Sequence, residues 1–174
     1  MGIKQNSDTI ISAPVKLTNK HLLDNFDCGI NQLNTYLTRF ALQNQYANAA
    51  ITFVVCEKNS VIGYYSLAVG SVEHELASLR IKKGLAHHPI PIMILARLAV
   101  DLNYQKKGIG KGLLKDAIFR TLQASQHAGI RAILVHAKNQ KARNFYEQFD
   151  FEPSPIDPLK LMLLLKDAKK AIST

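Results

Sequence analysis

Glycines and lysines gather where an apolar run gives way to a helical pattern, in the segment ARLAVDLNYQKKGIGKGLL at 96–114. Gly108 and Gly110 let the backbone approach a ligand without a Cβ in the way. A helix that starts there directs its free N–H groups and the positive end of its dipole at an anion. The lysines around the glycines are Lys106, Lys107 and Lys111. The spacing differs from GxxxxGK[ST] and GxGxxG, so we expect a phosphate-binding loop of another kind.

The spacing QKKGIG matches [QR]xxGx[GA], the pyrophosphate-binding motif of the GNAT superfamily of N-acetyltransferases. NQKARNFY at 139–146, with Phe151 after it, resembles the superfamily's Asn-x-x-A-x-x-FY-x-x-x-G-F segment, although Asp150 stands where glycine is usual. FDCG at 26–29, LNTYL at 33–37, LARLAVD and YQKKGIG resemble more narrowly the GNAT toxins of bacterial type II toxin–antitoxin modules. Those enzymes acetylate the α-amino group of aminoacyl-tRNA and stop translation.

The resemblance implies an acetyl-CoA site between two splayed strands. Backbone groups of Leu98 and Val100 are expected to hydrogen-bond the pantetheine arm, while Asn139 and Phe145 lie beside it. Plain packing or helix capping explains these last two equally well, since Asn139 is well placed as an N-cap. The residues expected to bind acetyl-CoA are Leu98, Ala99, Val100, Gln105, Lys106, Lys107, Gly108, Ile109, Gly110, Lys111, Asn139 and Phe145.

Tyr146 is the expected general acid, because a phenol held near the sulfur can protonate the leaving thiolate. The alternative is a structural tyrosine that fills space behind the cofactor. Residues 92–100 contain no acidic residue to act as a base, and Asp101 is the nearest carboxylate, with Glu73 and Glu75 before that strand.

An α-amine, with a pKa of about 7.7 to 8.0, needs less help than a lysine to become nucleophilic. The missing base therefore favours an α-amino acceptor. His136 is a candidate proton relay, although a histidine in an apolar strand is more often structural. The six histidines show no usual metal-ligand spacing with Cys, Asp or Glu, so we expect no metal.

Positive charge is concentrated in the middle of the chain. The formal net charge is +9. Residues 80–143 hold thirteen Lys or Arg against two acids, which is +11, and the rest carries −2. This asymmetry indicates a polyanionic partner, with a solvated basic face as the alternative. The residues expected to contact tRNA are Arg39, Arg80, Lys82, Lys83, Arg97, Lys138, Lys141 and Arg143.

Two other functions stay open at this stage. The first is a GNAT enzyme that acetylates a small amine or a protein N-terminus, which the scarcity of acids in 80–143 disfavours. The second is a GNAT-like binding module without turnover, which the presence of Gly108, Gly110 and Tyr146 disfavours. The toxin resemblance also implies a cognate antitoxin, usually of the ribbon-helix-helix type, and a homodimer.

Hydrophobic periodicity predicts the elements that position these residues. Strands are expected at 13–17, 51–57, 61–72, 92–100, 130–137 and 159–165. Helices are expected from residue 31, at 110–128 with Gly129 as its end, and at 140–149, with a helical or looping stretch at 76–91 and a polar tail. This order indicates one α/β (α+β) domain over 1–174, with a mixed sheet of six to seven strands flanked by helices and splayed between 92–100 and 130–137.

The remaining features indicate a cytoplasmic protein. The longest apolar stretch, at 90–100, is too short to cross a bilayer and contains Arg97. The first eleven residues include no apolar run of signal-peptide length. Cys28 and Cys56 fit free, buried thiols in a reducing compartment.

Overall fold

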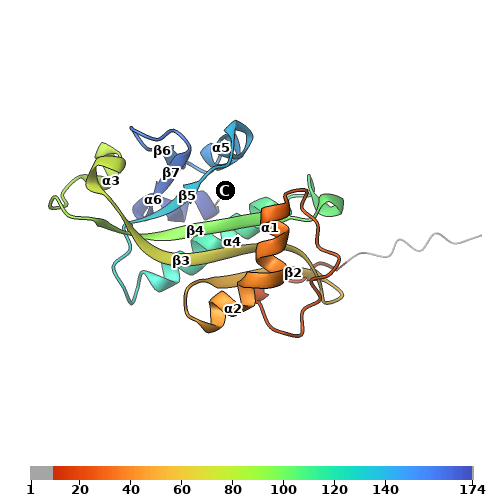
Figure 1. The fold of residues 1–174 in the computed structure, drawn as a ribbon. Coiled ribbons are helices and arrows are strands. Elements are labelled where there is room, and N and C mark those ends of the chain that lie inside the picture. Colours follow the sequence, from red (N-terminus) through yellow and green to blue (C-terminus); the bar gives the residue numbers. More distant parts are fainter. Residues whose placement is uncertain (1–9, 174) are drawn as a thin grey trace, which may run out of the picture.

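The computed structural model describes residues 10–173, so the expectation about the N-terminal segment falls almost wholly outside that range. Seven strands form one mixed sheet in the order β1-β2-β3-β4-β5-β7-β6. The strands are β1 Val15–Lys16, β2 Ile51–Glu57, β3 Ser60–Val72, β4 Ile90–Val100, β5 Ala132–His136, β6 Glu152–Pro153 and β7 Lys160–Leu164. Only β4 and β5, among these described pairs, run parallel. The predicted mixed sheet is thus confirmed (Figure 1).

Helices cover both faces of the sheet, with α4 behind it and α1 and α2 in front (Figure 1). The helices are α1 Asn31–Thr35, the π-helical turn η1 Tyr36–Phe40, α2 Ala41–Tyr46, η2 His74–Leu76, α3 Leu79–Lys82, η3 Leu102–Tyr104, α4 Ile109–Ala124, α5 Gln140–Glu147 and α6 Leu165–Ser173. Neighbouring residues of β3 direct their side chains to opposite faces of the sheet, as strand alternation requires. Tyr65 packs in the cluster that contains α4, and Tyr64 packs in the cluster beneath α1 and η1.

Local sequence explains the central hairpin. Lys58 and Asn59 join β2 to β3 with positive φ angles of 47° and 73°. A turn of this hand matches the twist of the strands that it connects. The hairpin predicted from the β-branched runs on either side is confirmed, with Glu57 paired to Ser60.

Two expectations about the second half of the chain were wrong, and one short strand was missed. Helix α4 ends at Ala124, and Ser125 ends it by donating its hydroxyl to the Leu122 carbonyl at 2.7 Å, so Gly129 is not the helix end. The expected polar tail is helix α6, whose Ala168 is fully buried. The short strand β6, which pairs with β7, was not expected. Three lysines and an aspartate separate the apolar residues of this segment, and they obscure the stripe of Leu165, Ala168 and Ile172 by which α6 packs on the core.

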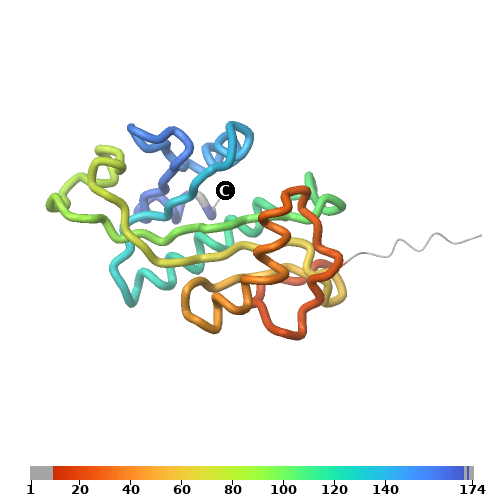
Figure 2. Tube along the Cα trace, in the orientation of Figure 1, coloured from red at the N-terminus to blue at the C-terminus, as the bar shows by residue number. Residues whose placement is uncertain are grey.

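Strands β4 and β5 separate halfway along β4, which confirms the predicted splay between them. Their pairing extends only from Ile92 to Leu95 on β4. Beyond Leu95, β4 stays with β3 as far as Val100, whereas the chain after β5 follows β7, with the Ala137 N–H donating to the Leu159 carbonyl at 2.7 Å. Figure 2 shows the two traces diverging toward α5.

A β-bulge lies at the point where the strands part. Ser66 of β3 pairs with Arg97 and the next residue, Leu67, pairs with Leu95, so Ala96 has no partner of its own. The extra residue changes the parity of the strand. Met93 and Leu95 before the bulge, and Leu98 and Val100 after it, therefore pack against the same cluster, which contains α4.

Candidate active site

A groove of about 390 Å³ opens where β4 and β5 part. It brings together residues from three stretches of the chain, 28–33, 95–110 and 135–146. The predicted site residues that line it are Arg97, Leu98, Ala99, Val100, Gln105, Gly110, Lys138, Asn139, Lys141, Phe145 and Tyr146. Its walls also include Cys28, Ile30 and Leu33, from the segment before and within α1, which were not among the expected site residues.

The free edge of β4 presents backbone groups to this groove. The Asp101 N–H donates to Ile62 on the β3 side at 2.8 Å. Consecutive residues of a strand direct their backbone groups to opposite edges, so those of Val100 and Leu98 face the groove. The Gln105 side chain donates to the Val100 carbonyl at 2.9 Å and to the Cys28 carbonyl at 3.3 Å. The side-chain amide of Gln105 therefore fastens the groove wall, and the N–H of Val100 stays available to an extended ligand.

The loop before α4 is built to hold an anion. Gly108 precedes α4 with a φ of +81°, a conformation that side chains rarely adopt, and no side chain caps the first amides of the helix. A Cβ on Gly108 would meet nothing within 4 Å, which leaves open space in front of the amides. The expected residues Lys106, Lys107, Ile109 and Lys111 belong to this loop and first turn and do not line the groove itself.

Tyr146 on α5 is held by aromatic packing and left free at its hydroxyl. Its ring contacts Phe145 and Phe151, with centroids 5.2 and 5.6 Å apart, and the residue is 7% exposed. Burial raises the pKa of the Tyr146 phenol, so the group stays protonated at neutral pH. Asn139 accepts a hydrogen bond from the Ala142 N–H at 2.9 Å and also lines the groove, so its capping role is confirmed.

The FDCG segment, which sequence reasoning noted without a role, ties α1 to the end of β4. The Asp27 carboxylate accepts from the Gly29 N–H at 2.8 Å and from the Asn34 amide at 2.9 Å. These donors lower the pKa of Asp27. The Asp27 N–H in turn donates to the Asp101 carboxylate at 3.0 Å. In the sequence only the FDCG motif indicated this network, because Asp27 and Asp101 lie far apart along the chain.

The carboxylates considered as bases lie elsewhere. Asp101 is 6% exposed, accepts from the Asp27 and Asn103 N–H groups, and does not line the groove. Glu75 Oε1 lies 2.9 Å from His87 Nε2, in the connection between β3 and β4. His136 does line the groove. In the part of the chain that the structure describes, no group of three or more His, Cys, Asp or Glu residues is arranged to hold a metal ion.

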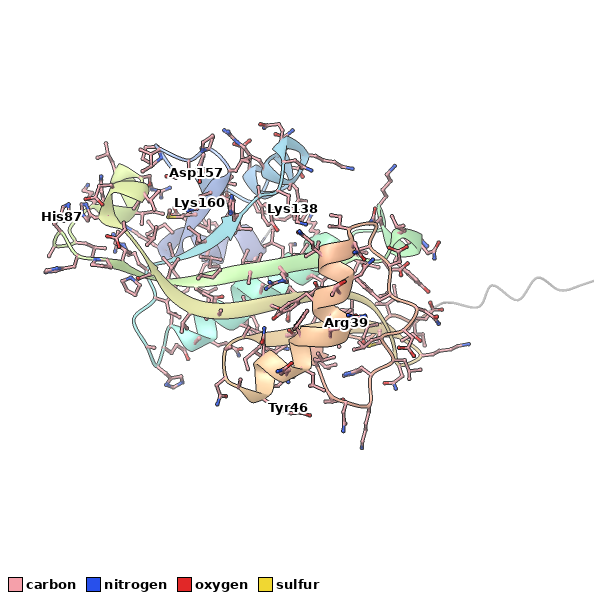
Figure 3. The ribbon with its side chains drawn as sticks, viewed as in Figure 1. Arg39, Tyr46, His87, Lys138, Asp157 and Lys160 are labelled. Carbon is pink, nitrogen blue, oxygen red and sulfur yellow. The ribbon has the colours of Figure 1, made fainter. Side chains whose placement is uncertain are left out.

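A second hollow of about 620 Å³ adjoins the groove on the side of α1. The two share Leu33, Ala96, Arg97 and Lys138. The second hollow is further lined by Asn31, Gln32, Thr35, Tyr36 and Phe40. Among residues 10–173, no Asp or Glu lines either space. Figure 3 shows Lys138 at the opening between β5 and α1.

Other residues expected to contact RNA lie outside both spaces. Arg80 on α3 forms ion pairs with Asp167 at 2.5 Å and Glu152 at 3.5 Å. Arg143 forms an ion pair with Glu147 at 2.8 Å. Lys82 and Lys83 lie at the end of α3, and Arg39 lies in η1, on the helix that follows α1 (Figure 3). No helix among the described residues is long and apolar enough to cross a membrane.

Comparison with known proteins agrees with this geometry. The model of the acetyltransferase (GNAT) domain family matches residues 48–153. A tRNA-acetylating toxin of Mycobacterium tuberculosis (strain ATCC 25618 / H37Rv) is 45% identical over 161 residues, which cover 92% of this chain and 96% of that protein.

Solved structures show the same fold. AtaT complexed with acetyl-methionyl-tRNAfMet matches with a TM-score of 0.85 and 28% identity, covering 92% of this chain and 98% of that chain. A tyrosine-to-phenylalanine mutant of the AtaT toxin, bound to the C-terminus of the antitoxin AtaR and acetyl-CoA, matches with a TM-score of 0.80 and 27% identity, covering 95% and 99%. Because the family match extends over more than half of the residues and the 45% identical relative covers nearly all of them, the chain belongs to the GNAT family of acetyltransferases.

Proposed function

We propose that this protein transfers the acetyl group of acetyl-CoA to the α-amino group of aminoacyl-tRNA, and that it blocks translation as the toxin of a toxin–antitoxin pair. The observation that carries the proposal is the junction of two spaces beside β4. One has the free strand edge and Tyr146, and the other has cationic residues and no carboxylate in its described lining. The relative named a tRNA-acetylating toxin and the AtaT complex with acetyl-methionyl-tRNAfMet support the same conclusion.

The donor fits the groove. The amides at the start of α4 and the lysines around Gly108 suit a pyrophosphate, and the backbone groups of Leu98 and Val100 suit an extended amide-containing arm. Asn139 and Phe145 flank that arm from α5 and its N-cap. Acetyl-CoA, when bound, supplies an acetyl thioester at the point where β4 and β5 part.

The transfer itself involves the acceptor amine, Tyr146 and water. The acceptor nitrogen forms a bond to the acetyl carbon as the carbon–sulfur bond breaks. Tyr146, protonated because burial raises its pKa, donates its proton to the sulfur and regains one from solvent. The amine loses its surplus proton to water, since no carboxylate among the described lining residues can take it.

An RNA acceptor explains the surplus of positive charge. Arg97, Lys138 and Lys141 lie at the two spaces, and Arg39 lies nearby on η1. We assign Arg39 and Lys141 to phosphates of the acceptor end and Arg97 and Lys138 to its aminoacyl terminus, with Lys82 and Lys83 as more distant contacts. Arg80 and Arg143 each form an ion pair with an acidic residue, so they contribute less to RNA binding.

The partners follow from the same proposal. We infer a cognate antitoxin, and the AtaT structure with the C-terminus of AtaR supports that inference. A ribbon-helix-helix antitoxin, a homodimeric toxin, a single domain over 1–174 and a cytoplasmic location remain proposals, in keeping with a target that takes part in translation.

The decisive experiment incubates the purified protein with labelled acetyl-CoA and a pool of charged tRNAs. Alkaline release of the amino acids then shows which carry the label. Uncharged tRNA and the Tyr146→Phe variant are the controls. Label on N-acetylated amino acids from at least one isoacceptor supports the proposal, and its absence from every isoacceptor refutes it.

A further inference from the structure

Arg97 is a half-buried cation without an acidic partner. Its guanidinium lies 3.6 Å from the centroid of the Tyr36 ring, at the junction between the groove and the second hollow. No described Asp or Glu comes within 4.0 Å of it. Charged side chains away from bulk water are normally paired. An unpaired arginine at this place therefore acts on whatever occupies the junction.

The groups around the junction share one electrostatic character. Those that can carry charge are Arg97 from β4, His136 at the end of β5, Lys138 before α5, Lys141 and Tyr146 from α5, Tyr36 from η1, and Cys28 from the segment before α1. None of them is a carboxylate. Burial raises the pKa values of Cys28 and Tyr146, which keeps both neutral at pH 7. The described part of the chain thus offers an incoming ammonium group cations and neutral groups only.

We propose that Arg97, assisted by Lys138, holds the acceptor α-amine in its neutral, nucleophilic form, so that the enzyme needs no general base. This inference rests on the proposed function, because it requires an α-amino acceptor at the junction. A positive charge nearby destabilises an ammonium ion and leaves the free amine unaffected. The ammonium loses its first proton to water before the attack, and its second after the nitrogen–carbon bond has formed.

The size of the effect follows from Coulomb's law. One charge about 6 Å away moves the pKa of an amine by roughly half a unit where water screens it well and by about two units where it does not. At a pH below the pKa of the amine, each unit by which that pKa is lowered raises the neutral fraction of the amine about tenfold. A free α-amine has a pKa of about 7.7 to 8.0, so even the smaller shift matters in a cell near pH 7.

The test compares pH profiles of wild type, Arg97→Gln, Arg97→Lys and Lys138→Gln. Single-turnover acetylation of charged tRNA is followed from pH 5.5 to 8.5, with acetyl-CoA and tRNA both saturating. Lysine at 97 keeps the charge and can still lie over Tyr36, whereas glutamine removes the charge. Lys138 is exposed, so its variant tests the same idea with little risk to folding.

In Arg97→Gln, the proposal requires the acidic limb of the pH–rate profile to shift to higher pH by at least half a unit. The shift should be smaller in Lys138→Gln and absent in Arg97→Lys. If the limb stays in place in both glutamine variants, and only the tRNA concentration for half-maximal rate rises, these residues merely bind RNA and the proposal is overturned. If wild-type protein labels no charged tRNA at all, the proposed function fails first, a result distinct from a labelled product with an unshifted limb.

Discussion

Replacing Tyr146 with phenylalanine removes one hydroxyl group and keeps the ring between Phe145 and Phe151. Burial alone, with no hydrogen bond from a described residue, shifts the pKa of the Tyr146 hydroxyl, so its loss leaves no buried partner unsatisfied. We therefore expect the free energy of unfolding to change by less than about 1 kcal/mol. Tyr146→Ala would remove the ring and lower the free energy of unfolding by about 3 to 5 kcal/mol, so a loss of activity in that variant would not report on the hydroxyl.

The effect on turnover is expected to be much larger. A positioned general acid contributes about 100-fold to 10,000-fold. The single-turnover rate of Tyr146→Phe should fall by at least about 100-fold, equivalent to roughly 2.7 kcal/mol of transition-state stabilisation. Acetyl-CoA affinity, measured by titration calorimetry, should stay within about twofold, since the ring packing is unchanged.

The matched control is Tyr46→Phe, because Tyr46 is 70% exposed at the end of α2 and lines neither space. It should behave as wild type. Equal rates for Tyr146→Phe and wild type would remove Tyr146 from the mechanism, and a large loss of acetyl-CoA affinity would make it a binding residue instead. Burial raises the pKa of Tyr146, and the protonated form is the active one. The wild-type rate should therefore show no decline due to Tyr146 between pH 7 and 9.

Four further predictions concern residues in and around the site. Gly108→Ala should lower stability by about 1 to 2 kcal/mol, because φ is +81°, and should weaken acetyl-CoA binding in calorimetry. Gly112→Ala, inside α4 where a Cβ meets nothing within 4 Å, should instead stabilise by about 0.5 to 1 kcal/mol in thermal unfolding. The pKa of Asp27 is lowered from 3.8, so its stabilising contribution is present at neutral pH and is lost as pH falls below that value; the difference in melting temperature between wild type and Asp27→Asn should be full at pH 7 and shrink as the pH is lowered below 3.8. Arg39→Ala should weaken tRNA binding and reduce the slope of log affinity against log salt by about 1 in filter binding, whereas an unchanged slope would exclude a phosphate contact.

Sequence reasoning worked best where the signal was local. Gly110, the apolar run of β4 and the Asn139 cap each act over a few residues, and the structure places them together at one groove, with Gly108 in the loop beside it. Asp150 is a related case. It stands where glycine is usual in the family, and its φ is +67°, the conformation that glycine adopts most easily.

Features that depend on contacts between distant segments could not be predicted. The second hollow exists because Tyr36 and Phe40 in η1 lie opposite Lys138, about a hundred residues later in the chain. The role of Asp27 requires Asp101 as its partner. Helix α6 looked like a polar tail because three of its nine residues are lysines, and only the burial of Ala168 against the core makes the pattern meaningful.

The bulge at Ala96 gives β4 one residue that it can lose without rearranging its two faces. Ser66 of β3 already pairs with Arg97 and Leu67 with Leu95, so deleting Ala96 would restore regular pairing and leave Met93, Leu95, Leu98 and Val100 on the side of α4. Deleting Ala99 instead would keep the bulge and turn Val100 to the opposite face of the sheet. Deletion of Ala96 should therefore be tolerated better than deletion of Ala99. A deletion scan along β4, scored by survival of a host that expresses the protein, would measure this difference directly.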